Sequence, residues 1–256
     1  MLIGLIGDTH GQTGAVLPAL QHARDAGAEL VVLMGDVGWW PRRAAMDFFG
    51  PVQRALRRLG MAGAGLDGNH DFPGDGTDRN GYLAWTAQAP DLSPGAFVRL
   101  DRGARFELDG CSFLTCGGAV SIDKSYRATT GPRATWWSEE AVTDADVDKV
   151  RRACGDAGPV DVLLTHDSVE LPPGFDPAGD AAFRAAADVQ RARMHLVREY
   201  ARPQLHVHGH FHDARVYCRT LDDGRELRTI GLGADGGSGC LYLQDTGKLR
   251  PQGRLR

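Results

Sequence analysis

The feature that most constrains this chain is a short apolar run, Leu2 to Ile6, that stops abruptly at Gly7-Asp8-Thr9-His10. An apolar run that ends in polar residues and glycine predicts a short buried strand. Side chains two positions apart on a strand point to the same side, so Asp8 and His10 can aim an oxygen and a nitrogen at one point. Metal ions bind such a pair, but an isolated Asp-x-His is more often a polar strand end. The choice depends on whether other strands end in the same way.

The same pattern recurs four more times. Apolar runs at Leu30–Met34, Met61–Leu66, Val160–Leu164 and Leu205–Val207 also end in polar residues of metal-ligand type. The candidate residues at the five strand ends are Asp8, His10, Asp36, Asn69, His70, His166, His210 and His212. Five of the nine histidines of the chain fall at these ends. Histidines placed at random along the sequence would not be expected to cluster in this way. A single histidine is more often a hydrogen-bonded structural residue, but the joint pattern favours a metal site.

The ligand types narrow the choice of metal. Two aspartates, one asparagine and four of the histidines provide oxygen and nitrogen ligands, which suit first-row divalent ions. Seven ligands are too many for one tetrahedral ion, so we expect two ions about 3.5–4 Å apart. The expected metal is Mn²⁺, with Fe²⁺ or Zn²⁺ as alternatives.

Strands and helices alternate in the first part of the chain. Helices are predicted at Thr13–Ala26 and Val52–Leu59, between the first three strands. This order predicts a right-handed α/β arrangement, in which sites form beyond the carboxyl ends of the strands. A short helix is expected near Tyr82–Gln88.

The rest of the chain predicts a second, antiparallel-looking β region with further helices. Strands are expected at Phe97–Leu100, Arg105–Leu108, Ser112–Cys116, Arg215–Leu221, Glu226–Leu232 and Cys240–Gln244. Helices are expected at Thr143–Ala157 and Ala178–Arg202, whereas Gly117–Glu140 is the least regular segment and is expected to form a long loop. No linker or repeat divides the sequence, so residues 1–256 are expected to form one domain.

Bulk properties limit the function classes. The net charge of −4 argues against general binding of nucleic acid or membranes by bulk electrostatics. The odd number of cysteines, five, without a Cys-x-x-Cys pair, argues against a disulfide framework and favours reduced thiols. The first apolar run is too short for a secretory signal and is interrupted by Asp8. We therefore expect a cytoplasmic protein.

Five blocks in order carry a family resemblance: Asp8-x-His10, Gly35-Asp36, Gly68-Asn69-His70-Asp71, His166 and Gly209-His210-x-His212. Each block is weak alone, but the ordered set is specific, and it resembles the calcineurin-like metallophosphoesterase superfamily. The resemblance spans nearly the whole chain. It implies an α/β fold, a four-layer α/β/β/α sandwich of two mixed sheets flanked by helices, with a two-metal centre.

The resemblance also implies a role for each residue. Asp8, His10 and His212 would bind the first metal, Asn69, His166 and His210 the second, and Asp36 would bridge both. His70 would not be a ligand but would protonate the leaving group. A hydroxide shared by two cations would attack phosphorus in line, with general-acid help worth roughly 10²–10⁴-fold.

One block departs from the protein-phosphatase branch of the superfamily. That branch carries Gly-Asp-x-x-Asp-Arg-Gly, whose later aspartate orients the catalytic histidine, whereas Trp39 occupies this position here. The departure disfavours that branch and leaves His70 without its usual carboxylate, unless Asp71 or another group replaces it. We hypothesise that His70 is a less effective general acid and that activated leaving groups are preferred.

The remaining distinctive residues each have two interpretations. Trp39, Trp40, Trp136 and Trp137 could line a substrate cleft or pack in the interior. Lys124, Arg127 and Arg133 could clamp phosphate, although a solvated loop is the commoner role for such residues. His206 and His208 are expected to be supporting or core residues rather than ligands.

The sequence thus predicts a dinuclear-metal-dependent phosphoester hydrolase that acts as a phosphatase on a small or protein-borne phosphate. A phosphodiesterase acting on nucleotides or nucleic acid is the alternative, which the negative net charge disfavours for long nucleic acids. A catalytically inactive interaction scaffold of the same fold is a third possibility, and loss of ligands would favour it. No ligand of the pattern is missing. No membrane partner is expected, and the sequence does not fix the oligomeric state.

Overall fold

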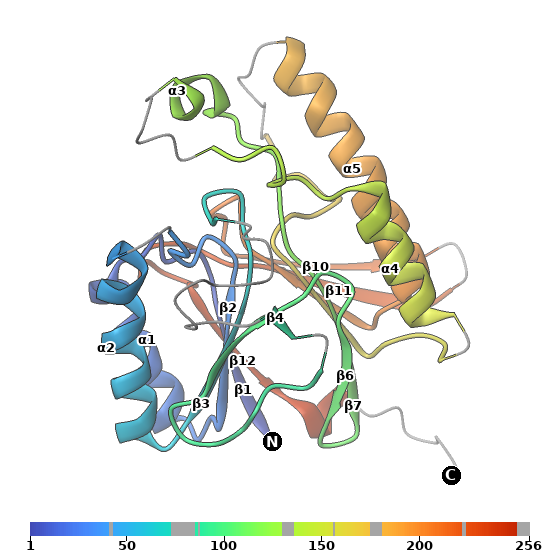
Figure 1. Ribbon diagram of the computed structural model, residues 1–256. Helices are drawn as coiled ribbons and strands as arrows, with labels where there is room; N and C mark the ends of the chain where they lie inside the picture. The colour runs from blue at the N-terminus through green and yellow to red at the C-terminus, as the bar shows by residue number, and fades with distance from the viewer. Residues whose placement is uncertain are drawn as a thin grey trace.

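Two mixed β-sheets packed face to face form the centre of the protein, and helices cover both outer faces (Figure 1). The computed structural model describes residues 1–40, 43–72, 85–86, 88–129, 136–155, 157–174, 181–221 and 224–249; only the backbone is described for 43–46 and 85. Among these residues, no helix has both the length and the apolar character that a membrane crossing needs. The layers confirm the predicted α/β/β/α sandwich.

The first sheet contains the N-terminal strands. Its order is β12 (Leu241–Asp245), β1 (Leu2–Ile6), β2 (Leu30–Met34), β3 (Ala62–Leu66), β5 (Phe97–Leu100) and β4 (Trp85–Thr86). All neighbours are parallel except β12, which pairs antiparallel with β1. Helices α1 (Thr13–Asp25) and α2 (Arg43–Leu59) lie on its outer face (Figure 1). The carboxyl ends of β1, β2 and β3 therefore lie side by side.

The second sheet contains the later strands. Its order is β10 (Arg215–Thr220), β11 (Glu226–Gly231), β9 (Leu205–His208), β8 (Val162–Thr165), β7 (Cys111–Cys116) and β6 (Arg105–Leu108). Strands β7, β8, β9 and β11 run parallel, and β6 and β10 are antiparallel edges. Helices α4 (Asp144–Cys154) and α5 (Ala181–Ala201) cover its outer face, and η2 (Thr246–Leu249) is a short final turn.

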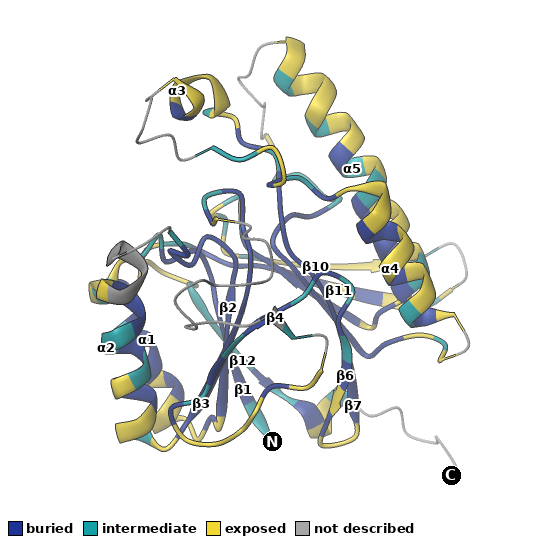
Figure 2. Ribbon diagram, in the orientation of Figure 1, coloured by how far each residue is buried: buried dark blue, intermediate teal, exposed yellow. Residues whose placement is uncertain are grey.

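Apolar side chains fill three layers between these elements. Strand β2 is buried along its whole length because Leu30, Val32 and Met34 face the second sheet while Val31 and Leu33 face α1 and α2. A third cluster lies between the second sheet and helices α4 and α5. Figure 2 shows the consequence: the central strands of both sheets are buried, whereas the edge strand β10 and the outer faces of the helices are exposed. The continuous apolar runs of the sequence are thus strands covered on both faces.

Three predictions about local structure were wrong. Trp85–Thr86, placed in a predicted helix, is a short strand, and the rest of that helix lies largely outside the described residues. Phe97–Leu100 joins the first sheet, because Gly63 of β3 leaves room for the Phe97 ring; a Cβ at Gly63 would approach it to 2.4 Å. Helix α3 (Lys124–Ala128) lies within the segment predicted to be a loop.

A buried arginine ties the first sheet to the helices over the second. Arg102 follows β5 and donates two hydrogen bonds to Asp67, at 3.1 and 2.6 Å, and a third to Asp146 of α4 at 3.2 Å. It also donates to the carbonyl groups of Glu139, Glu140 and Ala141. Because its donors are satisfied at several points of the chain, Arg102 acts as a cross-link inside the protein.

Arg102→Ala is expected to lower the free energy of unfolding by about 3–5 kcal/mol, since it leaves buried carboxylate charge without its partner. Denaturant unfolding of the metal-free protein measures this. Arg151→Ala is the control, because Arg151 pairs with Asp148 on the exposed side of α4 and such pairs contribute about 0–1 kcal/mol. Equal losses in the two variants would contradict the cross-link.

Candidate metal centre

The predicted ligand residues converge where the carboxyl ends of both sheets meet. Strands β1, β2 and β3 deliver Asp8, His10, Asp36 and Asn69, and β8 and β9 deliver His166, His210 and His212. Each set of residues follows the central strands of its sheet, so the site is formed jointly by loops from both sheets. Segments more than 200 residues apart in the sequence are thereby in contact, as in the bond from the His210 backbone N–H to the Asp8 carboxylate at 3.2 Å.

One half of the site contains Asp8, His10 and His212. One potential ligand atom from each lies within 4.8 Å of the others. The His212 Nε2 atom is 2.9 Å from Asp8 Oδ2, and the His10 Nε2 atom is 3.5 Å from Asp36 Oδ2. This is the set that the family resemblance implies for the first metal, and its geometry can hold a metal ion.

The other half contains Asn69, His166 and His210. His166 is fully buried, and its Nε2 atom lies 3.2 Å from Asn69 Oδ1 and 3.4 Å from Asp36 Oδ1. The ring of His210 packs beside that of His166, with 5.1 Å between centroids. Asp36 approaches histidines of both halves, with one oxygen toward each. Its place suits the predicted bridging role, which stays a prediction.

Hydrogen bonds fix which nitrogen the histidines present. His166 directs Nδ1 to the carbonyl oxygen of Met34 at 2.9 Å, so Nδ1 carries a proton and Nε2 is the nitrogen that faces the site and could bind a metal after losing its own proton. His10 directs Nδ1 to the Asp235 carboxylate at 2.9 Å, with the same result. Both rings are therefore oriented for ligation through Nε2.

The segment 117–140 supports Asn69. The Asn69 amide nitrogen donates to Ser121 Oγ at 3.1 Å, which leaves Oδ1 directed toward His166. Ser121 donates to Glu140 at 2.6 Å, and buried Arg127 donates to the Asn69 backbone carbonyl at 2.7 Å. Arg127 is thus an internal support, and the expectation of a solvated role for it was wrong. Lys124 is exposed over the ring of Trp136, and Arg133 lies outside the described residues.

Two motif glycines are needed because the backbone passes against ligand carboxylates. A Cβ at Gly68 would lie 2.1 Å from Asp36 Oδ1, and a Cβ at Gly209 would lie 2.2 Å from Asp8 Oδ1. Any larger residue would displace a carboxylate. The glycines of the Gly-Asn-His and Gly-His-x-His blocks are therefore required by the site itself.

Left-handed backbone is concentrated at the site. Seven non-glycine residues in the described chain have positive φ, and four of them are predicted ligands: His10, Asp36, His210 and His212. A fifth is Asp235, with φ of 54°. Such conformations cost of order 1–3 kcal/mol each and cluster at functional sites. Five here share one site, which marks the site as one that the surrounding fold holds in place.

The charges of the centre fit a divalent cation. Asp8 and Asp36 are buried, and among the described residues neither forms an ion pair with a lysine or arginine. Burial by itself lowers the pKa of His10 and His166, but the neighbouring carboxylates outweigh it and raise these pKa values to about 9 and about 10. The same histidines hold the pKa of Asp36 well below its usual range despite burial. Protons on histidines thus supply the positive charge that a metal ion would otherwise provide.

His70 lies at the edge of this centre. Its ring is 5.4 Å from that of His10, edge to face, and its backbone N–H donates to Asp36 at 2.7 Å. In the described part of the chain, no residue hydrogen-bonds to its imidazole. Burial, together with the charge of nearby Arg127, lowers its pKa. His70 therefore faces the site as a free imidazole, as the resemblance implies for an acid, but without an orienting carboxylate.

Asp71 does not supply that carboxylate. Its two oxygens accept four backbone N–H groups, those of Val37, Gly38, Trp39 and Gly68, at 2.8–3.0 Å. The residue therefore joins the loops that follow β2 and β3. This result supports the hypothesis that His70 is a less effective general acid, because no carboxylate among the described residues orients its imidazole.

The tryptophans divide between interior and site edge. Trp39 is buried, stacks on Phe49 with 5.9 Å between centroids, and carries the Arg99 guanidinium over its face. Trp40 is half-buried and donates its indole N–H to the His70 carbonyl oxygen at 3.1 Å. Trp137 contacts the ring of Phe72 edge to face, and Phe72 lies two residues after His70 in the sequence. Trp39 is thus a core residue, while Trp40 and Trp137 lie near the site.

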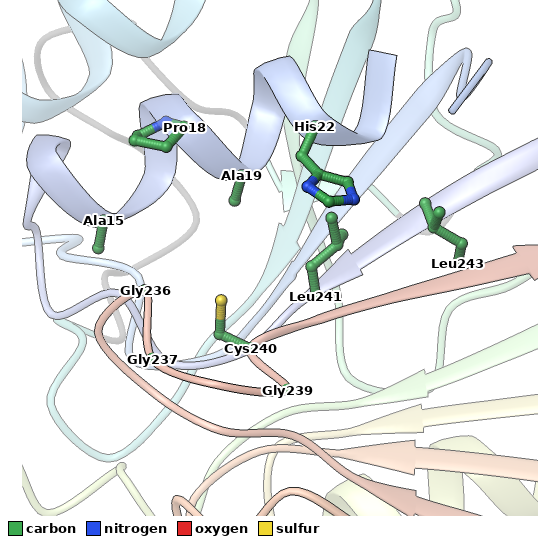
Figure 3. A pocket seen from close by; sticks show the side chains of 10 residues that line it. All are labelled: Ala15, Pro18, Ala19, His22, Gly236, Gly237, Gly239, Cys240, Leu241 and Leu243. Carbon is green, nitrogen blue, oxygen red and sulfur yellow. The ribbon is translucent and has the colours of Figure 1, made fainter. Parts of the chain in front are cut away.

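A separate cavity of about 340 Å³ lies between α1 and β12 (Figure 3). Its lining is mostly apolar and comes from Ala15, Pro18, Ala19, His22, Gly236, Gly237, Gly239, Cys240, Leu241 and Leu243. No predicted ligand lines it. The cavity lies on the outer face of the first sheet, so it is not the place where the predicted chemistry occurs.

Two residues that contact predicted ligands, Asp235 and Ser121, were not predicted from the sequence. Asp235 contacts His10, and it follows the apolar end of β11 and Gly233, the same pattern that identified the other strand ends. That pattern could have found it. Ser121 has no such signal, because a single serine in an irregular segment is common. His206 and His208 are buried beside Thr165 and the site loop, and they are supporting residues as expected.

Comparisons with known proteins agree with this geometry. A crystal structure of TT1561 from Thermus thermophilus is similar over 96% of this chain and 98% of that chain, with a TM-score of 0.55 and 15% identity. A dimetal phosphatase from Danio rerio, LOC 393393, is similar over 95% and 91%, with a TM-score of 0.51 and 14% identity. These likenesses show a shared fold. A comparison with curated protein sequences gives no match. The sequence model of the calcineurin-like phosphoesterases matches residues 1–214, and the chain therefore belongs to that family.

Proposed function

We propose that this metal-dependent phosphoesterase works with two divalent ions held between its sheets. Asp8, His10 and His212 would hold one ion, and a second set, Asn69, His166 and His210, would hold the other. Asp36 would contact both. The observation that carries this proposal is that two buried carboxylates face histidine and amide donors without a lysine or arginine partner among the described residues. A bound cation would satisfy all of these groups at once.

The residues of the chain have distinct tasks in the reaction. When bound, the two ions would lower the pKa of water and neutralise the charge of the phosphate. Asp235 and Met34 orient the ligand histidines, and Ser121 orients Asn69. His70 would donate a proton to the leaving-group oxygen. Burial lowers its pKa, so less of it is protonated at neutral pH.

We favour a phosphomonoester, small or protein-borne, as the substrate. The negative net charge supports this choice. So does the edge of the site, where two basic side chains already contact other parts of the protein: Arg127 bonds to the Asn69 carbonyl, and Lys124 lies over the ring of Trp136. A polymeric nucleic acid would need a basic surface along its phosphates.

We also propose Mn²⁺ as the metal and a cytoplasmic location. We propose a single domain over residues 1–256, because β12 near the end of the sequence pairs with β1 at its start.

A substrate screen tests the function. The protein is treated with chelator, reloaded with Mn²⁺, Fe²⁺ or Zn²⁺, and assayed on aryl and alkyl phosphomonoesters and on phosphodiesters. We expect turnover only after reloading, fastest on monoesters with Mn²⁺, and a loss of at least about 10²-fold in Asp36→Asn because the shared carboxylate is lost. Full activity in the chelated protein or in Asp36→Asn would refute the two-ion proposal.

The leaving group should reveal the role of His70. His70→Ala is expected to slow an alkyl phosphate by roughly 10²-fold or more and p-nitrophenyl phosphate far less, because a good leaving group needs no proton. Measured kcat values on the two substrates make the comparison. Equal losses on both would show that His70 is not the acid.

Metal binding should release protons. With pKa values of about 9 and 10, His10 and His166 are protonated at pH 7 in the metal-free protein, and each must lose its proton to bind a metal. Low pH therefore favours the free site, and metal affinity should rise as the pH increases from about 6 to about 9. Calorimetric titration with Mn²⁺ in buffers of different ionisation enthalpy counts the protons. Binding without proton release, at an affinity independent of pH, would contradict this account.

A further inference from the structure

We propose that Asp235 is a positioning residue that fixes the tautomer and direction of His10 and thereby strengthens one of the two metal sites. The proposal rests on the proposed two-ion function. It concerns a residue beyond the part of the chain, residues 1–214, that matches the family model. Its evidence is the geometry on both sides of the His10 ring.

The two ring nitrogens of His10 face different partners. Nδ1 lies 2.9 Å from Asp235 Oδ1, and Nε2 lies 3.5 Å from Asp36 Oδ2, at the centre of the site. An ionised carboxylate only accepts hydrogen bonds, so Asp235 holds the proton on Nδ1. Once Nε2 has lost its own proton, its lone pair is available to a metal, and the nearby negative charge makes the ring a stronger donor.

Asp235 is itself held in place before any metal binds. Its backbone N–H donates to the carbonyl oxygen of Asp8 at 2.7 Å, so one residue supports two neighbouring ligands. Gln12 donates to its carboxylate at 3.0 Å. Its backbone is left-handed, with φ of 54°. The carboxylate is exposed, with 41% of its side-chain surface accessible, and these contacts hold it against His10 and Gln12 at its inner side.

The support is unequal between the two halves of the site. His166, in the other half, directs Nδ1 to a neutral backbone carbonyl, that of Met34. Asn69 is supported by the Ser121 hydroxyl. In both His10 and His166, Nδ1 points away from the site. Among the described residues, Asp235 is the carboxylate that hydrogen-bonds to such an Nδ1 atom of a predicted ligand histidine. Its removal should weaken the site of Asp8, His10 and His212 and leave the other unchanged.

The left-handed backbone decides which variants are informative. Asn and Gly adopt positive φ readily, whereas Ala would add strain of its own. Asp235→Asn keeps a hydrogen-bond acceptor but removes the charge, and Asp235→Gly removes both. Asp25→Asn is the matched control, because Asp25 is exposed on α1 and accepts a hydrogen bond from Gln21 on the same helix.

The experiment titrates the chelated full-length protein with Mn²⁺ by calorimetry and records the unfolding midpoint of each metal-free variant. We expect the wild type and Asp25→Asn to bind two equivalents. We expect Asp235→Gly to lose about 10–100-fold in affinity for one equivalent, and Asp235→Asn to lose less, with the second equivalent and the unfolding midpoint unchanged.

Other outcomes separate this inference from the proposed function. Unchanged affinity for both equivalents would overturn the role of Asp235, and so would an equal loss at both accompanied by a lower unfolding midpoint. A wild type that binds one equivalent would refute the two-ion proposal instead. In that case the Asp235 variants are judged on that one equivalent, and an unchanged affinity would overturn the inference.

Discussion

Two buried carboxylates, Asp8 and Asp36, lie close together beyond the ends of the paired strands β1 and β2, without a lysine or arginine partner among the described residues. Like charges in such a setting repel strongly, and their desolvation is costly. The surrounding structure offsets this cost with histidines and with backbone N–H groups, such as that of His70 on Asp36. The left-handed turns and the closely approaching glycines around the site are the means by which the backbone reaches these oxygens.

The α/β/β/α sandwich holds this arrangement of carboxylates in place. Central strands of both sheets, buried on both faces, deliver the ligands, so that no ligand depends on an edge strand. Contacts between loops then lock the strand ends: Asp71 joins the loops after β2 and β3, and Arg102 joins the first sheet to α4. A weakly held site could not keep two carboxylates together in the absence of a metal.

The sequence predicted those parts of the structure that depend on local patterns. Apolar runs that end in glycine and polar residues were sufficient to locate the strands and the residues that converge, because every such run lies in a parallel strand with its carboxyl end at the site. Non-local contacts were beyond such patterns. The pairing of Phe97 with β3, the bond from Arg127 to the Asn69 carbonyl and the acceptance by Asp71 of the N–H groups of the loop after β2 all depend on partners more than 20 residues away.

Strand β12 completes the first sheet by pairing with β1, with Leu2 opposite Asp245. During synthesis on the ribosome, β1 therefore emerges long before its antiparallel neighbour exists. Its hydrogen-bonding edge stays open until β12 has been made, and an open edge can recruit strands from other molecules. The nascent protein would then be at risk of aggregation, and its yield in a cell would depend on chaperones that shield this edge while translation continues.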